Sequence, residues 1–396
     1  MAHIPETYEF SAERGFLPME DPETWLAFGS ADGAPWLLDI DSVTQWQSVA
    51  RDLPHYVTVG MARNIIRKLP PFPMQLLTKR EENIEHAMRM FSFLGHAYVF
   101  GGENTELTIP RVLAEPWHTI AQLLNRPPVL SYASYALYNW QRLDIQKPIT
   151  LDNIAVIQNF GGGIDENWFV LVHVDIEAKA GKGITVLYDA LDAAKGEDIY
   201  NTYTYLDAAA EHLSILHAIL KRMPDHCNPY IYYNRVRPYI QGWKHNPSFP
   251  NGIVYEGCFG NVPQQFRGET GAQSSILPAL DALLGIPHNK NDSFYQYLTE
   301  MRDYMPYPHR MFLKHLESNF GILRNFVIKN PSLHKPYLTC VESIFHFRAE
   351  HLQFAENYIA RQVPKRNNST TIGTGGTPFI PYLKKHKDDT FNALTW

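Results

Sequence analysis

Apolar residues recur every three or four positions over long stretches of this chain, which is the spacing of one face of an α-helix. In residues 78–94 these apolar positions alternate with charged ones, and this predicts an amphipathic helix. The same spacing predicts helices over residues 205–223, 276–284 and about 341–361. A chain with this pattern is expected to bury one stripe of each helix against its neighbours.

Two of the predicted helices have recognisable ends. Pro224 follows residues 205–223, and proline is expected to stop the helix there because it lacks a backbone N–H. Ser274 and Ser275 precede residues 276–284 as candidate caps, while Gly285 comes directly after them. These signals support short connections between helices.

Residues 168–176, WFVLVHVDI, do not fit a simple helical reading. They are rich in β-branched and aromatic residues, so propensity favours a strand. A short apolar run of this kind is equally compatible with a buried helix. Elsewhere the sequence contains neither a hairpin series nor a regular alternation of strands and helices, and the fold class predicted is all-α.

Composition excludes several classes of protein. The 396 residues include 35 basic and 41 acidic side chains, with no concentration of Lys and Arg, which argues against nucleic-acid binding. The three cysteines (Cys227, Cys258 and Cys340) are widely spaced, which argues against a disulfide framework or a structural zinc site. No apolar run reaches the roughly 18 residues of a membrane span, and no signal peptide is recognisable at the start. We therefore expect a cytoplasmic protein that does not enter membranes.

The chain divides into two predicted domains. Residues 69–73, LPPFP, are expected to form a stiff extended connector. A small N-terminal helical domain over residues 1–146 and a large helical domain over residues 147–396 are predicted. The polar, glycine-rich stretch at about 362–378 is expected to be a mobile loop, either a plain flexible turn or a lid over a site.

His351 is the histidine with the most distinctive surroundings. It lies on the apolar stripe of its predicted helix, close to Phe347 and Phe354, with Arg348 nearly one turn earlier. A buried core histidine fits this position. So does an axial haem ligand, because iron needs one neutral nitrogen and the haem carboxylates need a positive partner.

Two further polar residues stand among aromatic or apolar neighbours. Arg237 lies between Tyr232, Tyr233 and Tyr239, where it suits either a ligand carboxylate or a cation–π contact. His173 is the only strongly polar group for several residues of WFVLVHVDI. It is either a structural histidine or a hydrogen-bonding group of a pocket.

Six segments carry more specific information: RPPVLSYASYALYNW (126–140), GWKHNPSFPNGIVYEG (242–257), FRGETGAQSSILPALDALLGI (266–286), MRDYMPYPHRMFLKHLESN (301–319), FRAEHLQFAENYI (347–359) and GTGGT (373–377). In this order they resemble motifs of the indoleamine 2,3-dioxygenase family. The resemblance extends from about residue 55 to 380. Agreement in every segment makes it highly specific.

The resemblance implies a two-domain helical fold with haem b between helices of the large domain and the small domain forming part of the pocket roof. It implies an oxidoreductase of tryptophan catabolism that inserts both atoms of O₂, its co-substrate, across the indole C2–C3 bond of L-tryptophan, giving N-formylkynurenine. The implied partners are an indole amino acid and an electron donor that reduces the haem iron. It also implies that residues 168–176 are helical, and we adopt that interpretation.

By position, the resemblance assigns His351 as the proximal ligand of the haem iron and Arg348 as a neighbour of the haem propionates. Arg237 is implied to bind the substrate carboxylate, and His173 is the candidate catalytic residue. The other implied substrate-binding residues line or close the pocket: Phe169, Tyr132, Tyr135, Tyr233, Thr270, Gly271 and Thr374.

Several positions depart from the family pattern. His173 falls where the animal enzymes usually have serine, whereas the related tryptophan 2,3-dioxygenases use a histidine over the haem to bond the indole N–H. Tyr135 replaces a smaller cysteine-type residue, Tyr232 and Tyr233 replace a phenylalanine pair, and Glu269 replaces glycine. We expect a more polar pocket. This leaves two alternatives, a haem enzyme that oxygenates a tryptophan derivative, including by single-oxygen insertion, and a non-catalytic haem or ligand sensor.

Overall fold

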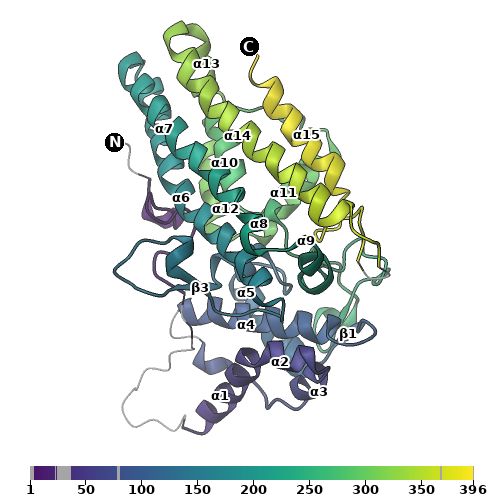
Figure 1. Ribbon diagram of the computed structural model, residues 1–396. Coiled ribbons are helices and arrows are strands. Elements are labelled where there is room, and N and C mark those ends of the chain that lie inside the picture. Colours follow the sequence, from purple (N-terminus) through teal and green to yellow (C-terminus); the bar gives the residue numbers. More distant parts are fainter. Residues whose placement is uncertain (1–3, 23, 25–36, 78–80, 366–367, 396) are drawn as a thin grey trace.

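The computed structural model describes residues 4–22, 24, 37–77, 81–365 and 368–395, and helices dominate them (Figure 1). The first five are α1 (Leu37–Arg51), α2 (Leu53–Thr58), α3 (Ala62–Ile66), α4 (Glu81–Phe100) and α5 (Arg111–Leu123). The others are α6 (Gly163–Lys195), α7 (Ile199–Leu220), α8 (Met223–His226), α9 (Pro229–Ile231), α10 (Ile276–Leu284), α11 (Ser293–Met301), α12 (Tyr307–Glu317), α13 (Ile322–Lys329), α14 (His334–Ala355) and α15 (Phe379–Asn392).

The strands are short and make two separate pairs. β1 (Thr108–Ile109) runs parallel to β4 (Val254–Tyr255), and β2 (Trp140–Arg142) runs antiparallel to β3 (Ile154–Val156). Strands of two or three residues cannot form a layer of their own. The predicted all-α fold is confirmed.

The helices form two groups in space (Figure 1). Helices α1 to α5 lie at one end, while α6, α7, α14 and α15 run beside one another at the other end. α7 packs against both α6 and α14, and α15 packs against α14. The division at residues 146 and 147 stays a prediction.

Helix α6 contains the segment that propensity assigned to a strand. It extends from Gly163 to Lys195, and Val170, Leu171, Val172 and Val174 are all buried along it. Burial at consecutive positions means that neighbours surround the helix, so no amphipathic period marks it. The strand preference of WFVLVHVDI was wrong because tertiary packing outweighs the small propensity differences between residues. The helical interpretation drawn from the family resemblance is confirmed.

The predicted helix boundaries shift in the structure. Residues 78–80 lie outside the described residues, and the helix predicted there is α4, which ends six residues later than expected. α7 begins at Ile199, and Pro224 lies in the first turn of α8, where a missing N–H costs nothing. α10 matches its predicted range, with Gly285 closing it at φ 66°. Of the two candidate caps, Ser275 makes no side-chain capping bond, while Ser274 Oγ accepts from Ile276 N–H at 3.3 Å. α14 begins at His334, and a π-helical turn, Glu356–Ala360, continues it.

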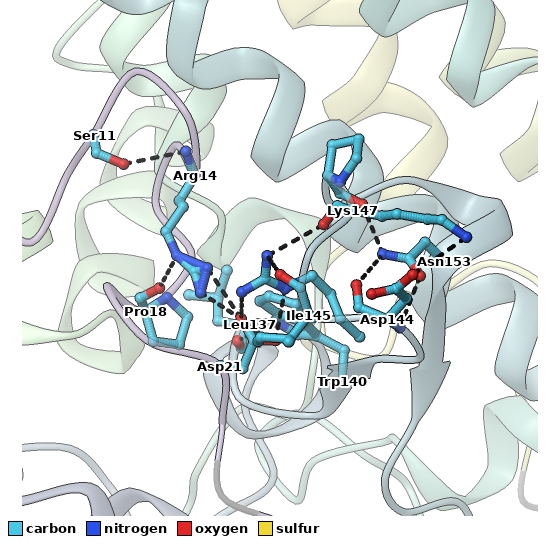
Figure 2. A network of polar contacts seen from close by, with 12 residues as sticks. Ser11, Arg14, Pro18, Asp21, Leu137, Trp140, Asp144, Ile145, Lys147 and Asn153 are labelled. Atoms are coloured by element: carbon cyan, nitrogen blue, oxygen red, sulfur yellow. Dashed lines mark hydrogen bonds and ion pairs between the residues drawn. The ribbon is translucent and has the colours of Figure 1, made fainter.

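Residues 4–22 pack against the C-terminal part of the chain. The ring of Tyr8 stacks on Phe312 of α12 with centroids 5.2 Å apart, and Phe10 lies 5.0 Å from the same ring. The carboxylate of Asp21 then accepts hydrogen bonds from Arg14, at 3.1 Å, and from Arg142, the last residue of β2, at 2.8 Å (Figure 2). This polar network fixes the N-terminal segment beside the loop that leads into β3.

None of the helices in the described part of the chain combines the length and the apolar character that crossing a membrane requires.

Candidate active site

Two cavities meet at His351 of α14. The larger, of about 300 Å³, is lined by charged side chains that include Asp281, His288 and Arg348, and it is called the charged cavity below. The smaller, of about 160 Å³, lies under residues 373–377 and is called the loop cavity. Both are lined by a shared set of residues: Gly271, Ala272, His351, Tyr382 and Leu383.

The imidazole of His351 is neutral and unpartnered. No described residue forms a hydrogen bond with its ring, and it lines both cavities. Burial lowers its pKa to about 4, and the neighbouring His173 and Arg348 act in the same direction. A neutral ring with a free nitrogen lone pair is what an iron ion needs from an axial ligand.

Small residues leave room for a flat group beside His351. A Cβ built on Gly271 would meet no atom within 4 Å, so the backbone there faces open space. Ala272 follows it, and aromatic and aliphatic side chains make up much of the remaining lining of the loop cavity. The neutral histidine, the open glycine and the cations of the charged cavity together fit a haem group.

Arg348 is held in a buried ion pair. Its guanidinium lies 2.7 and 3.0 Å from the two carboxylate oxygens of Asp281 on α10, and it donates to the hydroxyl of Thr390 on α15. Burial would raise the pKa of Asp281, but the charges of Arg348 and His288 outweigh burial and hold that pKa well below its ordinary value. Arg348 therefore has a fixed position on the wall of the charged cavity.

A histidine bridges two carboxylates next to this pair. His288 contacts Asp281 through Nε2 at 2.9 Å and Asp389 of α15 through Nδ1 at 3.0 Å. Burial opposes the charge of this ring, yet the two carboxylates raise its pKa above the ordinary 6.5. His386 lies beside it, and neither of its buried ring nitrogens has a partner among the described residues. Sequence analysis missed this cluster because its members come from distant segments.

Phe169 and His173 of α6 line the loop cavity together. Their ring centroids lie 4.7 Å apart, and His173 Nδ1 is 2.7 Å from the carbonyl oxygen of Phe169. Because a carbonyl only accepts, Nδ1 carries the proton and Nε2 is left as an acceptor. Burial lowers the pKa of His173, although its bond to Phe169 opposes this, and so keeps the ring neutral.

Three π-helical turns carry tyrosines of the site: Ala133–Leu137, Tyr232–Val236 and Glu356–Ala360. Such turns shift side chains relative to a regular helix and are frequent at functional sites. Tyr232 lines the loop cavity, with its ring centroid 4.8 Å from that of Phe169. Its neighbour Tyr233 instead donates a hydrogen bond to the carbonyl of Asn368.

Tyr132 and Tyr135 support the cavity from behind. The hydroxyl of Tyr132 donates to Glu177 at 2.9 Å, and that of Tyr135 donates to Glu166 at 3.3 Å. The ring of Tyr132 meets His173 edge-on at 5.9 Å, so these tyrosines contact cavity residues without lining the cavity themselves.

Arg237 is fully buried and bound by the glycine-rich loop. Its guanidinium donates to the side-chain oxygen of Asn368 and, at 2.6 Å, to the carbonyl of Ile372. Its Nε has no partner, and no described carboxylate pairs with its charge. A buried cation without a counter-ion is costly, which suits a site that receives an anion.

Further contacts seat the loop on residues 242–269. The hydroxyl of Thr374 donates to the carbonyl of Glu269, and the backbone carbonyl of Thr374 accepts from Gly242 N–H at 3.1 Å. Arg267 donates to the carbonyl of Gly375 at 2.6 Å. Residues 373–377 therefore cover the loop cavity, while residues 366–367 of the predicted loop lie outside the described part of the chain.

The structure brings together only part of the predicted site. Phe169, His173, Thr270, Gly271, His351 and Thr374 line the loop cavity, and Arg348 lines the charged one. Tyr132, Tyr135, Tyr233 and Arg237 lie close behind its wall. Tyr232 and Glu269 were not among the predicted site residues, and both line the loop cavity.

The chain is similar in sequence to known proteins. Residues 4–393 match the family described as indoleamine 2,3-dioxygenase. The chain is similar to indoleamine 2,3-dioxygenase 1 of Rattus norvegicus, at 32% identity over 99% of this chain and 96% of the relative. It is 29% identical to the indoleamine 2,3-dioxygenase of Saccharomyces cerevisiae, over 98% of this chain and 93% of that protein. A 6-hydroxytryptophan 2,3-dioxygenase of Fusarium equiseti is also 29% identical, over 98% of this chain and 97% of that protein.

Replacing the bridging histidine should destabilise the protein in a pH-dependent way. A raised pKa means that charged His288 stabilises the fold fully below pH 6.5, and this stabilisation is lost as pH rises through the folded-state pKa. We expect His288→Gln to lower the free energy of unfolding by about 1.5–3 kcal/mol at pH 5 and by clearly less at pH 8.5, measured by denaturant unfolding. Replacing the exposed His346 by Gln is the control. An equal loss at both pH values would contradict the prediction.

Proposed function

The chain belongs to the indoleamine 2,3-dioxygenase family, a family of haem dioxygenases, and from this premise we propose that its substrate is L-tryptophan. In the proposed reaction both atoms of one O₂ enter the product. The indole C2–C3 bond breaks and each of these carbons gains one oxygen, which gives N-formylkynurenine. That the protein is a dioxygenase-like oxidoreductase follows from the family; the substrate and product are our proposal.

The unpartnered neutral imidazole of His351 is the observation that carries this proposal. It supports haem b as the cofactor, with His351 as the proximal ligand and Arg348 near the propionates. Bound haem would supply the iron that activates O₂. An electron donor that keeps this iron reduced is proposed as the partner. We propose that the protein acts in the cytoplasm and binds neither nucleic acid nor membranes.

Arg237 is proposed to bind the substrate carboxylate. Its buried charge has no carboxylate partner among the described residues, so a bound amino acid would provide the missing counter-ion. Its present acceptors, Asn368 and Ile372, belong to the loop, so the arrival of a carboxylate and the position of the loop are coupled. The bidentate geometry of a guanidinium would fix the direction of the substrate.

His173 is proposed to accept the hydrogen bond of the indole N–H. Its Nδ1 is bound to the carbonyl of Phe169, and this leaves Nε2 as the acceptor. The rings of Phe169 and Tyr232 would contact the faces of the indole. Holding the ring in one orientation raises the reaction rate by proximity, and His173 needs no strong basicity for this role.

The remaining predicted residues are proposed to shape and close the pocket. Thr374 would hold the loop over the substrate through its bond to Glu269 and so exclude water. Thr270 and Gly271 would keep the wall beside the haem thin. Tyr132, Tyr135 and Tyr233 would fix the cavity wall through their bonds to Glu177, Glu166 and Asn368. We retain residues 1–146 as the proposed small domain and 147–396 as the haem domain.

A tryptophan derivative is the second candidate substrate. His173, Tyr232 and Glu269 add three polar groups to the lining of the loop cavity. A ring hydroxyl would find hydrogen-bonding partners there, and one relative is named for a hydroxylated tryptophan.

The test is mass spectrometry of L-tryptophan after incubation with the haem-loaded, reduced protein under ¹⁸O₂. We expect N-formylkynurenine that carries two labelled oxygen atoms, because both atoms derive from one O₂ molecule. The same reaction in labelled water under ordinary O₂ is the control and should give no label in fresh product. A singly labelled product, or unchanged tryptophan beside an oxygenated derivative, would contradict the proposed reaction.

Replacing His351 by Ala should abolish haem retention, because no other described residue offers a nitrogen at the wall shared by the two cavities without an existing partner. Haem absorbance per protein after gel filtration measures this. His346 lies on the same helix but is exposed, so His346→Ala should keep its haem. Full haem content in His351→Ala would show that the ligand assignment is wrong.

Replacing Arg237 by Leu should raise KM for L-tryptophan by about 100-fold and leave haem content nearly unchanged, because a buried charge partner of the carboxylate is lost. Steady-state kinetics and haem absorbance separate the two effects. Arg235 is two residues away and exposed, and Arg235→Leu should behave like the unmodified protein. Similar KM values in both variants would exclude Arg237 from carboxylate binding.

A further inference from the structure

Glu269 places a carboxyl group in the loop cavity from a rigid position. Its backbone N–H donates to the carbonyl of Ile240 at 3.0 Å, and its own carbonyl accepts the hydroxyl of Thr374. The preceding Gly268 lies against Gly242 so closely that an added Cβ would come within 2.2 Å of a backbone nitrogen. The backbone is thus fixed on both sides, and the side chain lines the cavity.

This carboxyl group has no partner in the protein. Only 3% of the residue is exposed, yet no described residue forms a hydrogen bond or an ion pair with the side chain of Glu269. Burial alone raises its pKa to about 8. The other two buried glutamates near the site differ, because Glu166 accepts from three backbone N–H groups and Glu177 accepts from Tyr132 and Ser274.

Glu269 and Arg237 are complementary but do not pair with each other. Arg237 is a buried cation without a described anion, and Glu269 is a buried acid without a described cation. Tyr232 lies within electrostatic reach of both of them. Both also meet the same loop, Arg237 at Asn368 and Ile372, and Glu269 at Thr374. Glu269 thus lines the cavity, Arg237 lies behind its wall, and both are bonded to the loop that covers it.

We propose that Glu269 recognises the α-ammonium group of the substrate, so that the cavity selects indoles that carry an amine. This inference rests on the proposed function, in which Arg237 binds the carboxylate of an amino acid. A buried ammonium needs a counter-charge, and Glu269 is the only carboxyl among the described residues that line the loop cavity. The zwitterionic end of the substrate would lie between Arg237 and Glu269, and the indole would point towards His173.

Binding of an amine should then release a proton. Near pH 7 the unpartnered Glu269 is mostly protonated, since its pKa is about 8, and contact with an ammonium would ionise it. The other titratable groups that line the cavity or reach Glu269 electrostatically are histidines and tyrosines: His173, His351, Tyr132, Tyr135, Tyr232, Tyr297, Tyr358 and Tyr382. Burial holds both histidines neutral and all these tyrosines protonated at pH 7, so Glu269 is the expected source of the proton.

Calorimetric titration of the haem-loaded protein without O₂ tests the proposal with three ligands. L-tryptophan carries both groups, tryptamine only the amine, and indole-3-propionate only the carboxylate. We expect Glu269→Gln to lower the binding affinity for L-tryptophan and tryptamine by about 10-fold or more. The affinity for indole-3-propionate should fall by less than about twofold. Titrations at pH 7 in buffers of different ionisation enthalpy should show release of about one proton with each amine in the unmodified protein.

Glu211→Gln is the control, because Glu211 is an exposed carboxyl of α7 that does not line the cavity. It should leave the ratio of tryptamine to indole-3-propionate affinity unchanged. Glutamine is the neutral isostere of protonated Glu269, so that variant should fold and keep its haem. The proton measurement on the unmodified protein needs no variant.

Equal weakening of all three ligands by Glu269→Gln would place the carboxyl against the indole ring and overturn the proposal. Unchanged affinities, amine binding without proton release, or no amine binding at all would also overturn it. The ¹⁸O₂ experiment separates this inference from the proposed function. If labelled product forms and Glu269→Gln leaves the ratio of tryptamine to indole-3-propionate affinity unchanged, the proposed reaction stands and the role of Glu269 is wrong. If this affinity ratio shifts but no oxygenated product forms, amine recognition by Glu269 stands and the proposed reaction is wrong.

Discussion

Burial of ionisable groups is the constraint on which the site depends. His173 and His351 face one cavity, and desolvation lowers the pKa of both rings below the ordinary 6.5. A neutral His351 has a free lone pair, while a neutral His173, tied through Nδ1 to Phe169, presents an acceptor at Nε2. If either ring were exposed, it would titrate near pH 6.5 and lose this role in part of the population. The long helices α6 and α14, packed on either side of α7, maintain that burial.

The loop over residues 368–377 completes the enclosure. It supplies acceptors for Arg237 and for Arg267, and it is held from below by the carbonyl of Glu269. Two of these contacts join a guanidinium to a carbonyl or amide oxygen of the loop, and the third joins the hydroxyl of Thr374 to a backbone carbonyl. A ligand carboxylate at Arg237 would compete with Asn368 and Ile372, so occupancy of the site and loop position are linked through one guanidinium.

The polar departures from the family pattern gather around one cavity and are not scattered over the fold. Tyr232 and Glu269 line it, and Tyr135 contacts Phe169 from behind. Together with His173, Tyr232 and Glu269 make the lining of this cavity more polar. Chemistry of this kind is set by side chains placed on a conserved scaffold.

The sequence by itself determined four of the helices, α4, α7, α10 and α14, because apolar spacing and an end signal such as Gly285 act within a few residues of one another. It also determined that His351 and Arg348 lie three residues apart on one helix, again a local relation. Tertiary structure alone decided that WFVLVHVDI is helical, since its strand propensity is outweighed by burial on all sides. Only the tertiary structure brings Asp281 to Arg348, Asn368 to Arg237 and Tyr232 to the cavity, because these pairings join segments far apart in the chain. It also decided which charges have no partner. In a sequence, a glutamate or arginine without a counter-ion cannot be told from one that has a partner. The lack of a counter-ion appears only when the surrounding chain has excluded water from both groups.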